Sequence, residues 1–210
     1  MPKTLILIPS RMSATRLPGK PLLKINNLSI ISHVVNKAKN TEIGRVVVCT
    51  EDLSILEDVV KNGGEAVLTG KHHKSGTDRI FEGYQKLNIK DIDYILNLQG
   101  DEPSINEKDI INLNNMMIET NSNIGTLGAE IKDKKMFSNE NIVKVETTEK
   151  LNNKNSSLAI SFKRSHSFKE EENIYHHIGI YAYKVKVLEK FINLNQTKNE
   201  TRYKLEQLRA

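Results

Sequence analysis

A loop with the sequence PSRMSATRLPGKP follows a short apolar run near the start of the chain. The loop combines the cations of Arg11, Arg16 and Lys20 with hydroxyl side chains and a glycine. A triphosphate requires this combination, because it is bound by fixed positive charge and by backbone N–H groups that it can approach closely. The loop is not a Walker loop, since Pro21 follows Lys20, and it lacks the GxGxxG dinucleotide pattern. We interpret it as a phosphate-binding loop, with a solvated basic turn as the alternative.

A second loop, LQGDEP, ends another apolar run and places the carboxylates of Asp101 and Glu102 between a glycine and a proline. Mg²⁺ usually takes one or two protein carboxylates and completes its coordination with water and substrate phosphate. We therefore predict Asp101 as a magnesium ligand. The alternative is a turn whose aspartate begins a helix.

A third loop, HHKSGTDR, follows a third apolar run and opens a helical pattern, so Ser75 or Thr77 is expected to cap a helix. The adjacent His72 and His73 suggest a metal. Zinc requires three or four ligands, however, and neither a cysteine nor a third histidine lies near in the sequence. The sequence therefore does not predict a zinc site.

These loops must be positioned by the elements that precede and follow them. Short apolar runs, typical of buried strands, alternate with amphipathic stretches of helical length. The expected strands are residues 4–8, 45–50, 65–69 and 94–98, and the expected helices are residues 30–39, 53–62 and 78–87. This βαβαβαβ order predicts a Rossmann-like α/β fold, with a mostly parallel central sheet, helices on both faces and ligands beyond the carboxyl ends of the strands.

The pattern changes after about residue 105, where a smaller α+β part is predicted. A helix is expected at 107–119, and strands at 125–131, 142–146, 158–162 and 178–183. Loops or a hairpin are expected at 132–141 and 152–155, and closing helices at 185–193 and 200–208. We predict one domain over residues 1–210, divided into two halves by this change of pattern near residue 105.

Composition narrows the class of protein. With 38% apolar and 27% charged residues, the chain of 210 residues is an ordinary globular sequence. Its net charge of +5 is spread without a block of like charge, which argues against nucleic-acid binding. The first apolar run is too short for a signal peptide or for a membrane span of about 20 residues. The single cysteine, Cys49, lies in an apolar run and fits a reducing compartment, so we predict a cytoplasmic protein.

The motifs PSRMSATRLPGKPL, HKSGTDR, NLQGDEP, NENIVKV, HIGIYAY and LEQLR occur in this order between residues 4 and 210. In these motifs the chain resembles the 3-deoxy-manno-octulosonate cytidylyltransferases, or CMP-KDO synthetases, within the sugar-acid cytidylyltransferases. The resemblance implies a nucleotide-diphospho-sugar transferase fold and a homodimer. It also implies a nucleotide-binding half (1–105) and a half for sugar binding and dimerisation (106–210). It also implies a magnesium-dependent transfer of CMP from CTP to the anomeric hydroxyl of 3-deoxy-manno-octulosonate (KDO), with release of pyrophosphate, for lipopolysaccharide biosynthesis.

The resemblance also implies roles for particular residues. Arg11, Lys20 and Asp101 are the implied catalytic residues, and Asp101 the implied metal ligand. The implied nucleotide-binding residues are Arg11, Ser13, Lys20, Ser75, Gly76 and Gln99. The implied sugar-binding residues are Arg16, Arg164, His177, Tyr181, Glu206 and Gln207. From the residues alone, Tyr181 or Tyr183 is also expected to pack in the core, and Glu206 to pair with Arg209 on a helix surface.

In the family the pattern continues beyond LEQLR to a loop whose aspartate is a second metal ligand, whereas this sequence ends at Ala210. Three explanations stay open: a fragment, replacement of the second ligand by Glu102, or a protein that binds CTP without turnover. Glu51, Tyr203 and the segment 163–171 also depart from the family pattern. Another sugar acid, such as an amino-substituted KDO or a sialic acid, is therefore an alternative substrate.

Overall fold

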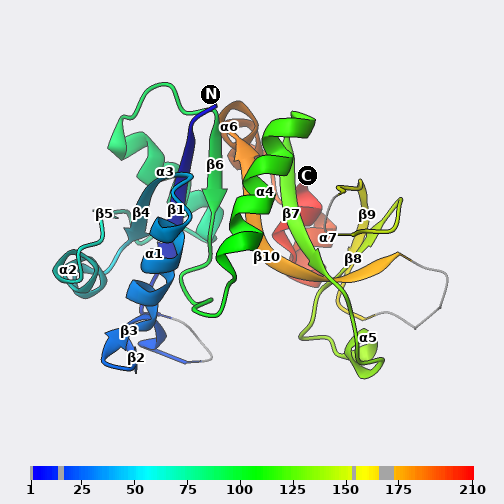
Figure 1. The fold of residues 1–210 in the computed structure, drawn as a ribbon, viewed down its shortest axis with the longest axis horizontal. Helices are drawn as coiled ribbons and strands as arrows, with labels where there is room; N and C mark the ends of the chain where they lie inside the picture. The colour runs from blue at the N-terminus through cyan, green and yellow to red at the C-terminus, as the bar shows by residue number, and fades with distance from the viewer. Residues whose placement is uncertain (1, 14–16, 153–154, 166–172) are drawn as a thin grey trace. The chain divides into compact units, whose positions relative to one another are not determined.

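The fold is described from a computed structural model, over residues 2–13, 17–152, 155–165 and 173–210 (Figure 1). The chain forms two compact units. The first unit comprises Met1–Gly125 and Ile180–Ile192, and the second unit comprises Thr126–Gly179 and Asn193–Ala210. The predicted division at residue 105 concerns function, and it stays a prediction. Among the described residues, no helix has the length and apolar character needed to cross a membrane.

The first unit is built on a mostly parallel sheet, as predicted. Its strands lie in the order β5 (Ala66–Leu68), β4 (Gly44–Thr50), β1 (Thr4–Ser10), β6 (Tyr94–Asn97) and the last part of β10 (Ile174–Lys184). The first four strands are parallel, and β10 runs antiparallel to β6. Every residue of β1 is buried, because helices cover both faces of the sheet.

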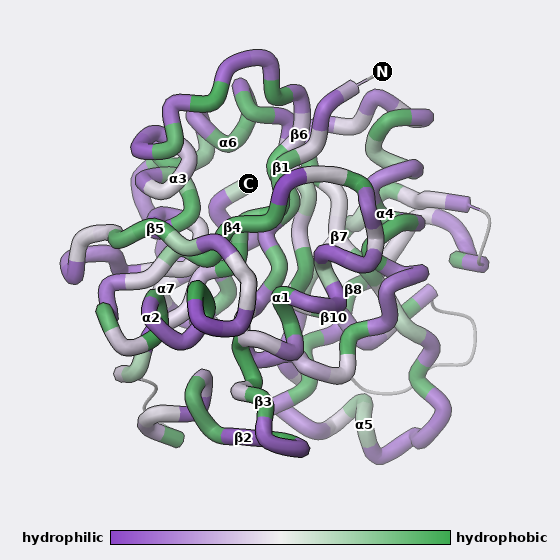
Figure 2. Tube along the Cα trace, turned by 60° about the vertical axis from the view of Figure 1, so that its left-hand side comes forward, coloured by the Kyte–Doolittle hydropathy of each residue, from purple (hydrophilic) through white to green (hydrophobic). Residues whose placement is uncertain are grey.

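Helices of the first unit lie on both faces of this sheet. On one face, α1 (Ile30–Asn40) contacts β1, β4, α2 (Leu53–Lys61) and α4 (Glu107–Thr120), and Figure 1 draws α1 and α4 in front of the strands. On the other face, Ile80 of α3 (Gly76–Leu87) and Leu188 of α6 (Val185–Ile192) pack in one apolar cluster with alternate strand residues, among them Leu7 and Cys49. Figure 2 shows apolar residues on the central strand β4 and hydrophilic residues in peripheral segments such as β2. The predicted α/β fold is confirmed.

The second unit contains a small antiparallel sheet. The first part of β10 pairs with β8 (Lys144–Thr147), which in turn pairs with β9 (Ala159–Lys163). The strand β7 (Ile124–Ala129) pairs with β10 and contains residues of both units. The helix α5 (Lys135–Ser138), the helix α7 (Lys198–Tyr203) and the 3₁₀ turn η2 (Glu206–Arg209) complete the unit.

Several expectations about the elements are wrong. The predicted helix 200–208 is two elements, because Lys204 adopts a left-handed conformation (φ 53°) that ends α7 before η2 begins. The helix α5 lies inside the predicted loop 132–141, and β10 begins at Ile174 instead of residue 178.

Two short elements of the first unit were also not expected. The 3₁₀ turn η1 (Lys20–Leu22) is followed by a hairpin of β2 (Lys24–Ile25) and β3 (Leu28–Ser29). Asn26 and Asn27 turn this hairpin, since both have the positive φ of a type I′ turn.

Candidate active site

The three predicted loops leave the same edge of the first unit's sheet. Because β1, β4, β5 and β6 are parallel, their carboxyl ends meet there. In α/β proteins this edge is where ligands bind. The first loop follows Ser10 of β1, the HHKSGTDR loop follows β5, and the LQGDEP loop begins directly after Asn97 of β6.

The first loop is held at both of its described ends. The N–H of Met12 donates to Asp52 Oδ2 (2.8 Å), which ties the start of the loop to the segment after β4. The N–H of Gly19 donates to Met12 O (3.0 Å), and Gly19 has φ 74°, a conformation that favours glycine. Arg11 and Ser13 are exposed at this edge, whereas Arg16 lies outside the described residues. The loop thus presents cations and hydroxyls to solvent at the ligand-binding edge.

Lys20 joins the first loop to the LQGDEP loop. Its Nζ lies 2.8 Å from Asp101 Oδ2 and 3.2 Å from Asp101 O. The predicted triphosphate cation and the predicted metal ligand are therefore neighbours, although 81 residues separate them in the chain. Both side chains are partly exposed, at 31% and 53%. A ligand can therefore reach both.

The carboxylates of this loop fit a hard divalent cation. Asp101 already attracts a positive group, and the side chain of Glu102 follows it directly. Partial burial and the charge of Asp101 raise the pKa of Glu102. Burial is the larger cause, and the smaller one is repulsion between two neighbouring carboxylates, which a bound cation would relieve. Carboxylate oxygens are the ligands that Mg²⁺ prefers, so Asp101, with Glu102 beside it, is suited to hold this ion.

The HHKSGTDR loop and the LQGDEP loop both pack closely on the end of β1. A Cβ added to Gly76 would lie 3.0 Å from Pro9 Cγ and 3.9 Å from Gln99 Oε1. A Cβ added to Gly100 would lie 2.9 Å from Pro9 O. Ser75 caps α3, because its side chain accepts a hydrogen bond from the N–H of Asp78. Three of the predicted nucleotide-binding residues, Ser75, Gly76 and Gln99, are therefore brought to one place.

Thr77 does not cap a helix, so that alternative is wrong. It lies inside α3, and its Oγ1 accepts a long hydrogen bond (3.5 Å) from Asn97 Nδ2. The oxygens Ser10 Oγ and Asn97 Oδ1 are buried at the ends of β1 and β6, and neither has a hydrogen-bond partner among the described residues. Buried polar atoms without a partner are uncommon in folded proteins. Ser10 and Asn97 were not predicted as site residues. In the sequence, each is distinguished only as a polar residue at the end of an apolar run.

A buried polar network beside this edge was also missed. Arg79 of α3, 3% exposed, forms an ion pair with Glu51 and donates to Thr69 Oγ1 (2.7 Å). The carboxylate of Glu82 pairs with His73. Ligand atoms of His72, His73 and Glu82 lie within 4.8 Å of one another, so the structure supplies the third metal-type ligand that the sequence lacked. Glu82 accepts hydrogen bonds from His73, the Gly70 N–H and Lys86. These bonds explain why its carboxylate lies so close to the histidines.

The predicted sugar-binding residues fall in both units. Tyr181 is in the first unit, where its ring stacks on Tyr183 with centroids 5.8 Å apart. Arg164, His177, Glu206 and Gln207 are in the second unit. Of the two tyrosines expected to pack in the core, Tyr183 is the buried one (3% exposed).

Arg164 is held by backbone carbonyls of its own unit. Its guanidinium donates to Tyr203 O (2.8 Å), Lys204 O (3.1 Å) and Glu140 O (3.2 Å). Behind it, the buried ammonium of Lys144 donates to three further carbonyls, among them Arg164 O at 2.6 Å. Burial lowers the pKa of Lys144. These bonds fix the position of Arg164 within the second unit.

The other second-unit residues are also fixed by neighbours. His177 is 9% exposed, and its Nε2 lies 3.0 Å from Thr126 Oγ1. Burial and the nearby His176 lower the pKa of His177 to about 4. Glu206 lies 3.8 Å from Arg209, which forms a buried ion pair with Glu200. The expected pairing of Glu206 with Arg209 is thus present, but Arg209 is buried and not on a helix surface.

The sequence pattern of a protein family described as "Cytidylyltransferase" matches residues 5–210. The 3-deoxy-manno-octulosonate cytidylyltransferase of Rhodopseudomonas palustris is 43% identical over 210 residues, covering 100% of this chain and 85% of that protein. The protein of the same name from Bartonella bacilliformis is 40% identical, covering 99% of this chain and 85% of its own length.

Solved structures give the same result. The structure of CMP:2-keto-3-deoxy-manno-octonic acid synthetase complexed with CTP is 34% identical, with a TM-score of 0.87, and the match covers 99% of this chain and 84% of that one. A cytidylyltransferase from Leptospira borgpetersenii, 20% identical with a TM-score of 0.62, covering 100% of this chain and 71% of that one, shares the fold. The chain therefore belongs to the cytidylyltransferase family and, within it, to the 3-deoxy-manno-octulosonate cytidylyltransferases.

Proposed function

We propose that this protein transfers CMP from CTP to the anomeric hydroxyl of KDO, giving CMP-KDO and pyrophosphate for lipopolysaccharide biosynthesis. Its family membership supports this reaction. The observation that carries the proposal is the pairing of Lys20 with Asp101 at the carboxyl edge of the sheet. It joins a phosphate-type cation and a metal-type carboxylate in one place.

The reaction is an in-line displacement at the α-phosphorus of CTP. The bond from the sugar oxygen to phosphorus forms while the bond to the bridging oxygen of pyrophosphate breaks. Negative charge develops on the departing pyrophosphate, and fixed positive charge there lowers the barrier. Lys20 and Arg11 supply this charge. The N–H of Gly19 donates to Met12 O, which ties together the two described ends of the loop that carries them.

Asp101 would hold the magnesium ion in this proposal, with Glu102 beside it. There Mg²⁺ would neutralise phosphate charge and orient the triphosphate. Lys20, whose Nζ lies 2.8 Å from Asp101 Oδ2, is close enough to contact the same phosphates.

The nucleoside part of CTP binds where the other two loops meet. Ser75, Gly76 and Gln99 contact it, and Ser13 of the first loop adds a hydroxyl. The close approach of Gly76 to Pro9 supports this assignment, because a side chain at that position would fill the space between the loops.

The sugar acid is bound by residues that offer a cation for its carboxylate and polar groups for its hydroxyls. We propose Arg16, Arg164, His177, Tyr181, Glu206 and Gln207 for this role. We also propose a homodimer. Leu158 and Ile160, at 73% and 58% exposed, lie at and beside the edge strand β9, where a second copy would bury them. A reducing compartment, the cytoplasm, suits the single buried thiol.

The test is release of pyrophosphate from CTP, magnesium and KDO, with a sialic acid in place of KDO in a parallel reaction. We expect turnover with KDO. Asp101→Asn should lower kcat by at least about a hundredfold, because the metal loses its charged ligand. Asp91→Asn is the matched control, since Asp91 is exposed and precedes β6 at the opposite edge of the sheet. It should leave kcat unchanged.

The result can contradict the proposal in two ways. Turnover with the sialic acid but not with KDO would assign another substrate. Binding of CTP without any pyrophosphate release would support a nucleotide-binding module. Full activity of Asp101→Asn would remove Asp101 from the metal site while leaving the reaction itself intact.

A further inference from the structure

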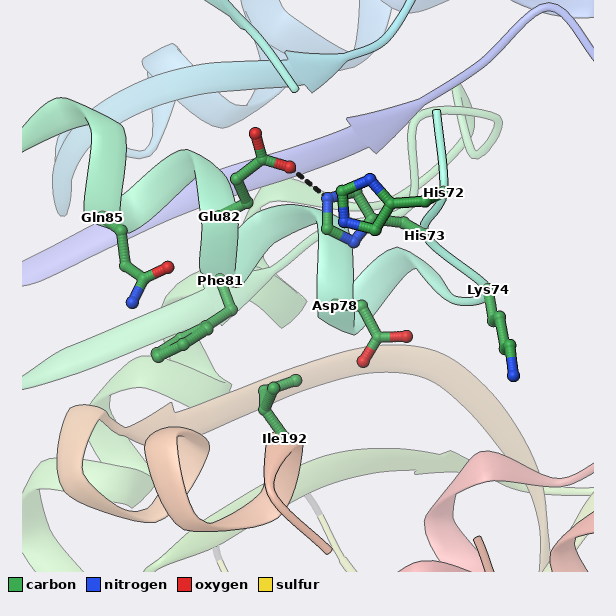
Figure 3. Close-up of a pocket in the computed structure, with 8 residues that line it drawn as sticks. All are labelled: His72, His73, Lys74, Asp78, Phe81, Glu82, Gln85 and Ile192. Atoms are coloured by element: carbon green, nitrogen blue, oxygen red, sulfur yellow. Dashed lines mark hydrogen bonds and ion pairs between the residues drawn. The ribbon is translucent and has the colours of Figure 1, made fainter. Parts of the chain in front are cut away.

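The loop of residues 69–75 connects β5 to α3 and ends at Ser75 and Gly76, which the proposed function assigns to the nucleotide. The position of these two residues depends on how the loop is held. Figure 3 shows His72, His73 and Lys74 of this loop beside Glu82 of α3 and Ile192 of α6. They line a pocket of about 400 Å³.

Glu82 reaches back from α3 to two points of the loop. Its Oε2 accepts a hydrogen bond from the N–H of Gly70 (2.8 Å) and pairs with His73 Nε2, the contact drawn as a dashed line in Figure 3. One carboxylate oxygen thus links the second and fifth residues after β5. Burial would raise the pKa of Glu82, but hydrogen bonds from Lys86, His73 and Gly70 hold it at about 2. The carboxylate is therefore charged at neutral pH.

The two histidines pack against each other and over the start of the loop. Their ring centroids are 4.3 Å apart. A Cβ added to Gly70 would lie 2.5 Å from His72 Nδ1, so the ring of His72 closely covers this glycine. His73 is largely buried, with 9% of its side chain exposed.

Two other groups hold the ends of the loop but not its middle. Arg79 donates to Thr69 Oγ1 (2.7 Å) and to Gly70 O (3.3 Å), which fixes the first two residues. Ser75 caps α3 and so fixes the last residue. Between these ends, the pair of His73 and Glu82 connects the loop to the helix. Without it, the backbone that leads into Ser75 is tied to α3 only at its ends.

We infer that His73 and Glu82 are positioning residues for nucleotide binding: their contact holds the loop so that Ser75 and Gly76 meet the nucleoside part of CTP. This inference rests on the proposed function. Neither side chain needs to touch the nucleotide. Their effect is on its affinity, since a loop that is already in the binding conformation does not have to be ordered when the ligand arrives.

The test measures binding of CTP and CMP by titration calorimetry, together with KM and kcat. His73→Ala should weaken CTP and CMP by the same factor, about tenfold, as expected for one hydrogen bond to a charged group. It should raise KM for CTP by that factor and change kcat by less than about twofold, because a uniform loss of binding does not alter the chemical step. His73→Gln, whose amide can still donate to Glu82, should keep the affinity near that of the wild type.

Gln85→Ala is the matched control. Gln85 of α3 lines the same pocket and is exposed, and its side chain makes no hydrogen bond with the described residues. Its removal should leave both affinities unchanged. Circular dichroism must show that each variant is folded. If His73→Ala does not fold, the affinity of His73→Gln tests the inference.

Each outcome decides for or against the inference. Unchanged affinity in folded His73→Ala overturns it, and so does a glutamine variant as weak as the alanine variant. A loss confined to kcat also overturns it, because it would place His73 in the chemical step. If the wild type itself does not bind CTP, the proposed function fails instead.

Discussion

Lys20 is the cation proposed for the triphosphate, and this role can be measured on the single residue. Its ammonium pairs with Asp101 in the structure. A triphosphate offers it more negative charge than a monophosphate does. Lys20→Ala should therefore weaken CTP about tenfold or more and CMP much less. Binding of the two nucleotides by titration calorimetry checks this.

Lys90→Ala is the control for this substitution, because Lys90 is exposed near the opposite edge of the sheet. It should change neither affinity. Equal losses for CTP and CMP in Lys20→Ala would contradict a role in triphosphate binding. They are instead the pattern expected for His73→Ala, so the two variants separate the phosphate side of the site from the nucleoside side.

His177 should make the stability of the protein depend on pH. Burial and the nearby His176 lower its pKa to about 4, whereas the unfolded chain binds the proton near pH 6.5. Between these values the unfolded state is protonated and the native state is not, so the free energy of unfolding falls as the pH falls. The expected loss between pH 7.5 and pH 5 is about 2 kcal/mol.

Urea unfolding of the wild type and of His177→Gln at the two pH values measures this contribution. The glutamine variant should lose less stability between pH 7.5 and pH 5 than the wild type. An identical loss in both proteins would show that His177 takes up its proton in the native state as readily as in the unfolded one.

At the scale of elements, α3 depends on a glycine that lets it approach the sheet. A Cβ added to Gly83 would lie 2.3 Å from Cys49 Sγ. Gly83→Ala should therefore destabilise the fold by about 1–3 kcal/mol, although alanine alone favours a helix by about 1 kcal/mol. Adding Cys49→Ala removes the clash and should restore part of the loss. Urea unfolding of the single and double variants gives the coupling.

Gly179→Ala is the matched control, because a Cβ there has no atom within 4 Å. This substitution should lower the free energy of unfolding only slightly. Additivity of the Gly83 and Cys49 substitutions would contradict a direct contact between α3 and β4 at this point.

The elements of the first unit could be predicted from the sequence because both faces of its strands are buried. Continuous apolar runs such as that of β1 result from this burial, and they identify the strands and therefore the loops that follow them. The break at Lys204 could not be predicted in this way. A lysine with positive φ has no local signature, and this one is followed by η2, where Arg209 pairs with Glu200 of α7.

In the candidate site, too, some features could be predicted from the sequence and others could not. Residue types and their place after strands were enough to select Lys20 and Asp101 as candidates, whereas the nucleotide role of Ser75 came from the family resemblance. The contacts that hold those loops were not predictable, because they join residues far apart or on different elements. The pair of Lys20 and Asp101 spans 81 residues, and Glu82 belongs to a helix pattern that gives no sign of its contact with the preceding loop.

At the scale of the whole molecule, CTP should stabilise the unit that contains its proposed loops. A ligand at about 100 times its Kd adds about 2.7 kcal/mol to the free energy of unfolding. Amides of β1 and β4 that exchange only on unfolding of the first unit should then exchange about a hundredfold more slowly. Hydrogen exchange with mass spectrometry, with and without CTP and magnesium, measures this.

Peptides from β8 and β9 are the internal comparison, since these strands belong to the second unit. They should be protected less than β1 and β4. Protection confined to β8 and β9 would place the nucleotide outside the proposed loops.

Cys49 has a practical consequence for work on this enzyme. It is the single cysteine of the chain, it is fully buried in β4, and burial raises the pKa of its thiol to about 12. Thiol-directed fluorophores and spin labels should therefore not react with the native protein. A cysteine introduced at an exposed position can be labelled at that position alone, with no need to remove the native one. Reaction at Cys49 itself then reports the opening of the sheet.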